Sequence, residues 1–250
     1  MQNPVDTVDD MQGLPLSEQA YRLIKAAILR GDIEPGSRLK IETFQRQYAF
    51  SSSPLREALN RLTADGLVDI DERRGFRAAG VSMESMQDIT AFRLNIEPAS
   101  LRESIQLGGD DWEAEVLAAY HRLDRLEARA TDERPYFDEW TERHRAFHMA
   151  LIAGCPSRRQ LAVCASLFDQ VERYRRLSIS WRKTRGDRAN EHRTIMEAAL
   201  NRDQALATDL LRAHIERTVM HVSNMLAARE PQPKASRRGA AKIPKKTTEA

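Results

Sequence analysis

Residues 51–67, SSSPLREALNRLTADGL, have the pattern of one helix with well-marked ends. Three serines offer an N-cap, and Pro54 stands in the first turn, where a helix needs no amide hydrogen. An apolar stripe with helical spacing then runs to Gly66 and comprises Leu55, Ala58, Leu59 and Leu62. Because this stripe must face a core, the polar side chains face outward, namely Ser53, Arg56, Glu57, Asn60 and Arg61.

Two further helices precede this one, and a hairpin follows it. Apolar residues recur at helical spacing over 16–30 and 41–48, on either side of a turn at 31–38. Short runs of strand character at 67–70 and 76–81 flank a basic tip that contains Arg73, Arg74 and Gly75. This order predicts a winged helix-turn-helix (three helices plus a β-hairpin) at 16–82, after a flexible N-terminus at 1–15.

The outward-facing side chains of the third helix suit DNA. Arginine pairs with guanine and asparagine with adenine in the major groove, while hydroxyl and amide groups at a helix start contact phosphate. The predicted DNA-binding residues are Ser51, Ser52, Ser53, Arg56, Asn60, Arg61, Arg73, Arg74 and Gly75. Periodicity alone leaves open that Arg56 and Arg61 are solvated charges, some paired with Glu57 or Asp65.

The remainder of the chain is predicted to be helical. Beyond residue 82 strand signals end, and turn signals separate six long amphipathic segments over 83–228. The fold class is therefore mainly α, with a C-terminal all-α six-helix bundle. Residues 229–250 are basic and poor in apolar side chains, which predicts a disordered tail that either solubilises the chain or attracts DNA phosphates.

Composition excludes several classes of protein. Of the 250 residues 41% are hydrophobic and 30% are charged, and no apolar run reaches the roughly 20 residues that span a bilayer. The first 14 residues lack the basic start and apolar core of a secretory signal, so we expect a cytoplasmic protein. Cys155 and Cys164 have no CxxC spacing and predict neither a disulfide framework nor a thiolate zinc site.

Four histidines form a candidate metal site. His144 and His148 are spaced i, i+4, so both imidazoles lie on one helix face. His192 and His214 share helix faces with apolar residues and should point into the bundle. Metal sites are built in bundle cores, although an isolated pair at this spacing is more often incidental.

Three linked motifs resemble the winged helix of the GntR family of regulators. They are GDIEPGSRL at 31–39, SSSPLREALNRLTADGL at 51–67 and RRGFR at 73–77. The resemblance implies DNA contacts by Arg56, by Ser51 to Ser53 and by Gly75. The family often carries an arginine where Ser52 stands and sometimes one where Glu42 stands, which leaves the operator sequence open.

Residues 85–226 look like the FCD ligand-binding domain of the FadR-type branch. The motifs are AFRLNIEPASL at 91–101, HRAFHMAL at 144–151, NEHRTIMEAAL at 190–200 and LLRAHIERT at 210–218. The resemblance implies that His148, His192 and His214 are metal ligands, with His144 where Asp or Asn is usual. Replacing a carboxylate with imidazole favours zinc or nickel, and manganese stays open. It further implies that Arg93 binds an effector carboxylate, the alternative being an intrahelical pair with Glu97.

These features predict a DNA-binding transcriptional repressor rather than an enzyme. We expect a small organic acid, bound at a divalent metal ion, to modulate its affinity for DNA, and the resemblance implies a homodimer on palindromic double-stranded operator DNA. One alternative is a purely structural metal. Another is a metal-dependent hydrolase, because a histidine cluster with an open position can activate water.

Overall fold

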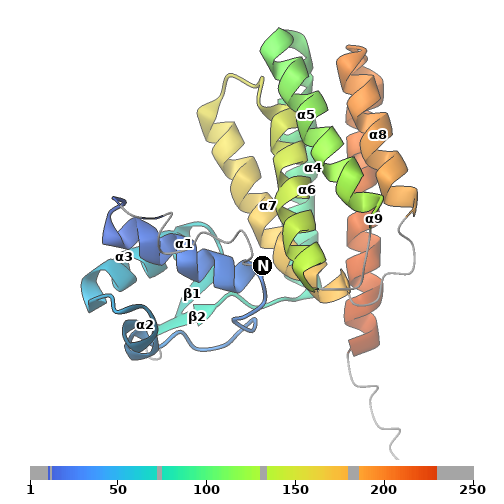
Figure 1. Ribbon diagram of the computed structural model, residues 1–250. Coiled ribbons are helices and arrows are strands. Elements are labelled where there is room, and N and C mark those ends of the chain that lie inside the picture. Colours follow the sequence, from blue (N-terminus) through green and yellow to red (C-terminus); the bar gives the residue numbers. More distant parts are fainter. Residues whose placement is uncertain (1–10, 12, 72–74, 130–133, 180–185, 230–250) are drawn as a thin grey trace, which may run out of the picture.

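The computed structural model describes residues 11, 13–71, 75–129, 134–179 and 186–229 (Figure 1). Arg73 and Arg74, the predicted basic tail at 230–250 and most of the predicted flexible N-terminus lie outside the described residues. At the end of that N-terminal segment, Met11 is buried and Gln19 donates a hydrogen bond of 2.8 Å to the carbonyl of Leu14.

The N-terminal elements form a winged helix-turn-helix. Three helices, α1 (Leu16–Leu29), α2 (Ile41–Tyr48) and α3 (Ser52–Ala64), precede the antiparallel strands β1 (Val68–Asp71) and β2 (Gly75–Ala78). The predicted apolar stripe of α3 is fully buried, together with α1 and β1 side chains, in a core of Ala20, Ile24, Ile28, Leu39, Phe44, Leu55, Ala58, Leu59, Leu62, Leu67, Val68 and Ala78. The helix pattern was therefore predicted correctly.

The segment before α2 differs from the predicted simple turn. Arg38 forms a bridge with Arg77 of β2, and the amide of Leu39 donates to the carbonyl of Phe76 at 2.9 Å. The free edge of β2 offers unpaired backbone groups, and the extended chain that leaves Gly36 satisfies them. This contact is long-range, so the local sequence did not indicate it.

In the described residues beyond 82, six helices follow, as predicted. They are α4 (Met83–Leu107), α5 (Asp110–Glu127), α6 (Arg134–Ile152), α7 (Arg158–Ile179), α8 (Gly186–Leu200) and α9 (Gln204–Arg229). The glycines at 108–109 separate α4 from α5, and the segment at 201–203 separates α8 from α9. None of the helices in the described residues combines the length and apolar character that crossing a bilayer requires.

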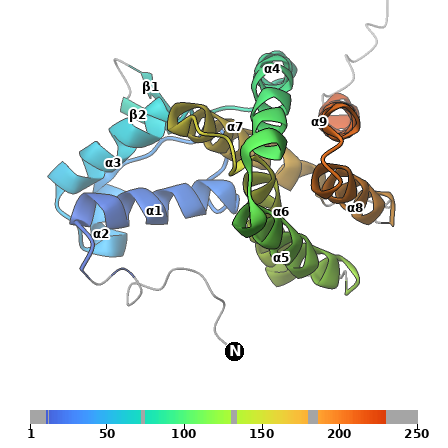
Figure 2. The ribbon, with the colours of Figure 1, turned by 90° about the horizontal axis from the view of Figure 1, so that it is seen from above.

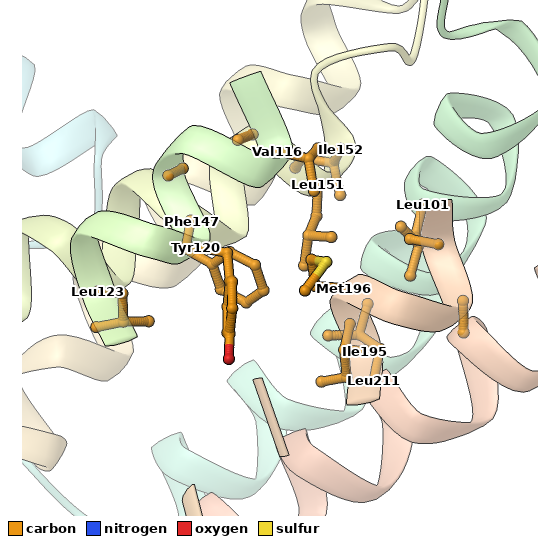
Figure 3. Packing of buried hydrophobic residues seen from close by; sticks show 14 of the residues in the cluster. Leu101, Val116, Tyr120, Leu123, Phe147, Leu151, Ile152, Ile195, Met196 and Leu211 are labelled. Carbon is orange, nitrogen blue, oxygen red and sulfur yellow. The ribbon is translucent and has the colours of Figure 1, made fainter. Parts of the chain in front are cut away.

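The larger of two apolar clusters in the described part of the bundle joins its helices, and the smaller one lies between α4, α7 and α9. Figure 3 shows Tyr120 of α5, Phe147 and Leu151 of α6, and Met196 of α8 pointing toward one another. The ring centroids of Tyr120 and Phe147 lie 6.0 Å apart. Cys155 and Cys164 are buried free thiols, and burial raises the pKa of Cys164 to about 11, so this thiol stays protonated at neutral pH.

Helix α7 lies between the winged helix and the rest of the bundle. In both views it stands between the N-terminal elements and the α8–α9 pair (Figure 1, Figure 2). It contacts α1 on one side, and α4, α6 and α9 on the other.

Candidate DNA-binding and metal-binding sites

The outer face of α3 is available to DNA. Arg56 and Asn60 are exposed, as are the three serines at its start. Ser51 occupies the N-cap position, but its side chain makes no capping hydrogen bond, so its hydroxyl is not used by the helix. An exposed helix start with hydroxyl and amide donors, followed by arginine and asparagine, has the groups needed for phosphate and base contacts.

Arg61 has a different environment from Arg56. Its Nη2 lies 2.9 Å from Oε2 of Glu18 in α1, and its guanidinium lies 4.1 Å from the ring centroid of Tyr21. Hydrogen bonds from Arg22 and Arg61 lower the pKa of Glu18. The pairing residue comes from α1, which packs against α3, and not from the neighbours Glu57 or Asp65. Contact between Arg61 and DNA stays a prediction, and it would compete with this pair.

Of the three predicted wing-tip residues, Gly75 lies in the described part of the chain. This residue has φ 76°, a conformation that glycine adopts without strain, and no atom lies within 4 Å of a Cβ built on it. Conformation, and not lack of space, therefore favours glycine at the wing.

The four predicted ligand histidines converge in the bundle. His144 and His148 come from α6, His192 from α8 and His214 from α9, and all four are buried. One ring nitrogen of each lies within 4.8 Å of the others, and the Nε2 atoms of His144 and His148 are 3.1 Å apart. Bonds of about 2.1 Å from a tetrahedral zinc ion to nitrogen would place neighbouring ligand atoms about 3.4 Å apart. The cluster fits such an ion after a small contraction.

Burial keeps three of these histidines, His144, His148 and His214, neutral. Burial first, and then the nearby Arg175, lowers the pKa of His144 well below its usual value. Burial and then His214 do the same for His148, and the pKa of His214 is lowered to about 4. Neutral imidazole is the form that binds metal ions, so these three rings are ready for a metal at pH 7.

Carboxylates orient two of the rings. Nδ1 of His214 donates to Oε2 of Glu191 at 2.8 Å, and Nδ1 of His192 lies 3.3 Å from Oε1 of Glu127. Because a carboxylate only accepts, the proton sits on Nδ1 and the Nε2 lone pair is free. Within the described residues, Nε2 of His192 is buried without a hydrogen-bond partner. A metal ion would satisfy this orphaned atom.

His144 is held differently. Its Nδ1 lies 3.2 Å from Nη1 of Arg175, and this guanidinium also donates to Oε2 of Glu172 at 2.7 Å. Because a guanidinium only donates, Nδ1 of His144 accepts and the ring proton lies on Nε2, facing His148. Ligation through Nε2 therefore requires His144 to give up its bond with Arg175.

Sequence reasoning missed Arg175. It follows Phe168 by seven residues and Val171 by four, so helical spacing places it on their buried face. That periodicity was the available signal. Arg93, the predicted effector residue, is also buried and pairs with Glu97, with Nη2 3.0 Å from Oε2. The alternative intrahelical pair thus exists in this structure.

The space beside the cluster is small. A cavity of about 10 Å³ borders His148 and is also lined by Glu97, Met149, Leu151, Ile152, Cys164, Phe168 and Leu211. This volume holds about one water molecule. A larger ligand therefore needs side chains or helices to move.

An exposed recognition helix joined to a bundle with a buried, ligand-competent cluster defines a DNA-binding transcriptional regulator with its own ligand-binding domain. The chain belongs to the GntR family. Residues 16–77 match the bacterial regulatory proteins of the gntR family, and residues 88–217 match the FCD domain. The family and the branch predicted from the motifs are confirmed.

Named relatives support the same class. The HTH-type transcriptional repressor GlaR of Escherichia coli (strain K12) is 39% identical over 203 residues, which cover 80% of this chain and 92% of that protein. The HTH-type transcriptional regulator BphR of Paraburkholderia xenovorans (strain LB400) is 37% identical over 205 residues, which cover 82% and 84%.

Solved structures share the fold. E. coli McbR/YncC superposes with a TM-score of 0.70 at 15% identity, covering 85% of this chain and 99% of that chain. A putative GntR regulator from Rhodococcus sp. RHA1 gives a TM-score of 0.68 at 20% identity, covering 83% and 97%. At these identities the likeness concerns the fold alone.

Proposed function

We propose that this chain is a cytoplasmic repressor whose operator binding is modulated by a small carboxylate, bound at a divalent metal ion in the bundle. The observation that carries the proposal is the convergence of four buried histidines from three helices, with ligand atoms within 4.8 Å of one another. Repression is supported by the name of GlaR. We place the DNA-binding domain at 16–82 and the effector domain at 83–228.

His148, His192 and His214 would hold the ion, with His144 as a fourth ligand. Zinc suits a set of imidazole ligands best, and nickel or manganese are the other candidates. When bound, the ion would supply a Lewis acid, and a carboxylate would join the histidines as a further ligand, since zinc can expand from four to five ligands. Glu127 and Glu191 keep the rings of His192 and His214 in the tautomer that offers Nε2 to the site.

Two buried arginines would recognise the effector. Arg93 from α4 and Arg175 from α7 each pair with a glutamate of their own helix. When His144 turns its Nε2 lone pair to a metal, its Nδ1 carries the proton and no longer accepts from Arg175. Arg175 can then donate to an effector, and two forked guanidinium groups suit a small acid with two carboxylates.

On DNA we propose a homodimer on a palindromic site. Two recognition helices related by two-fold symmetry read successive major grooves about 34 Å apart. Arg56 and Asn60 of α3 would read bases, while Ser51, Ser52 and Ser53 contact phosphate. Arg73, Arg74 and Gly75 would bring the wing to the DNA backbone.

The test titrates small dicarboxylates against the metal-loaded protein on a duplex that the protein selects from a random pool. We expect one acid to change the DNA affinity by about 5- to 150-fold. His148→Ala should abolish this response, and His121→Ala, which changes an exposed histidine of α5, should keep it. If no acid changes DNA affinity in the metal-loaded wild type, the sensing function is wrong.

The closed surroundings of His148 favour a second candidate, a purely structural metal. Removing the ion distinguishes the two functions. A loss of melting temperature without loss of the effector response would support the structural role. Loss of both would support the sensor.

A further inference from the structure

Two faces of helix α7 make contacts with other parts of the protein, and the first face contacts the histidine cluster. The ring centroid of Phe168 lies 5.4 Å from that of His144 and 5.6 Å from that of His148. Seven residues further on, Arg175 donates to Nδ1 of His144. A change in the position of the α6 histidines would therefore displace the α7 side chains that contact them, because protein interiors are close-packed.

The second face of α7 holds the winged helix by its backbone. Gln170 and Ser166 each donate a 3.0 Å hydrogen bond to the carbonyl of Asp65, the residue that ends α3. Arg173 donates at 2.6 Å to the carbonyl of Ala79, just after β2. These carbonyls stand at the ends of secondary structure, where no partner in the same element is available. These hydrogen bonds therefore attach α7 to both the recognition helix α3 and the wing.

Asp169 of α7 forms ion pairs with both the winged helix and α6. Its carboxylate lies 2.7 Å from Nζ of Lys25 in α1 and 2.8 Å from Nε of Arg145 in α6, and its side chain is only 3% exposed. Burial alone lowers the pKa of Lys25, but the pairing with Asp169 outweighs it and the pKa is raised. Arg145 stands between His144 and His148 in the α6 sequence. One buried carboxylate thus connects the DNA-binding region with the helix that carries half of the histidine cluster.

A second connection runs parallel to the first. Arg176 of α7 pairs with Asp138 of α6 and donates at 3.1 Å to the carbonyl of Arg30, which ends α1. Between the two connections, α1 faces α6 and α7 across a cleft of about 240 Å³. The cleft leaves room for α1 to shift against α6 if the ion pairs change.

We propose that Asp169 is the positioning residue through which occupation of the histidine site controls the docking of α1 against the bundle. The inference rests on the proposed metal site. Histidines of α6, α8 and α9 that share an ion would fix the position of Arg145. Asp169 then holds Lys25 in one place, and the winged helix loses the freedom to reorient. Coupling needs only this two-sided ion pair and no contact between ligand and DNA.

The experiment measures amide hydrogen exchange of the full chain with and without Zn²⁺, alongside calorimetric titration of Zn²⁺. In the wild type we expect Zn²⁺ to slow exchange of the α1 amides by at least about fivefold, the lower limit of usual couplings. Asp169→Asn keeps the shape but not the charge. It should bind Zn²⁺ with unchanged affinity and lose the slowing in α1. A merely structural role would change α1 exchange equally with and without Zn²⁺.

Two further variants keep the test informative if Asp169→Asn does not fold. Lys25→Met breaks only the α1 side of the connection and should also lose the response. Arg143→Met is the control, because Arg143 lies on α6 but contacts Glu139 of the same helix and the carbonyl of Arg122 in α5. It should respond as the wild type does.

Three outcomes overturn the proposal. If Zn²⁺ still slows amide exchange of α1 in Asp169→Asn and in Lys25→Met, Asp169 does not connect the histidine site with α1. If Zn²⁺ binds the wild type without changing α1, there is no coupling, although the metal site stands. If Zn²⁺ does not bind the wild type, the metal site fails as well, so the two failures are distinguishable.

Discussion

Acidification should unfold the metal-free protein in a pH range where carboxylates still carry their charge. His144, His148 and His214 have depressed pKa values in the folded chain, because burial penalises their charged form. In the unfolded chain each regains the ordinary value of 6.5. Below that pH the unfolded state binds more protons than the folded state does, so the free energy of unfolding falls as the pH falls.

The expected loss is large. Each histidine contributes up to about 1.4 kcal/mol per pH unit below 6.5, so three together approach about 4 kcal/mol per unit. Between pH 7 and pH 5 the free energy of unfolding should drop by about 6 kcal/mol. Folded domains have only about 5 to 15 kcal/mol in total, so the metal-free chain should be close to unfolding at pH 5.

Urea unfolding, followed by circular dichroism in the presence of a chelator at several pH values, measures this slope. His148→Gln removes one titrating ring and should reduce the slope by about 1.4 kcal/mol per pH unit. His121→Gln, which replaces an exposed imidazole of α5, is the matched control for the substitution itself. A wild-type slope below about 1.4 kcal/mol per pH unit, which corresponds to the uptake of one proton on unfolding, would refute the assignment of buried neutral histidines. An unchanged slope in His148→Gln would refute it too.

Three more predictions can be checked with purified protein. Zn²⁺ at 100 times its Kd should stabilise the wild type by about 2.7 kcal/mol and raise the Tm by about 5 to 10 °C in a thermal-shift assay, whereas Ca²⁺, which prefers oxygen ligands, or Zn²⁺ added to His148→Ala should not. Arg56→Ala should weaken binding to a selected duplex by about 1 to 3 kcal/mol in fluorescence anisotropy, and the control Arg102→Ala, at an exposed site on α4, should bind as the wild type does. Gly75→Ala should lose about 1 kcal/mol in urea unfolding because of its positive φ, whereas Gly80→Ala, at an open site outside the positive-φ region, should be neutral.

Helix positions were predictable because their causes are local. The apolar stripe of α3 and its Gly66 end follow from the 3.6-residue repeat and from backbone freedom. The i, i+4 spacing also put His144 and His148 on one face before any fold was known. Distant contacts had no such signal. Arg61 pairs with Glu18 of α1 because α1 packs on α3, and β2 takes a third segment because its edge was open.

The sequence by itself determined the class of this protein, through the order of its elements, three linked DNA-binding motifs and four histidines in recognisable contexts. Tertiary packing decided which groups act together. It brought His192 and His214 onto the α6 pair, set Arg175 against His144, and placed Asp169 between Lys25 and the helix of the cluster. The physical reason is that periodicity fixes which face a side chain occupies, while its neighbours across helices depend on how whole faces pack.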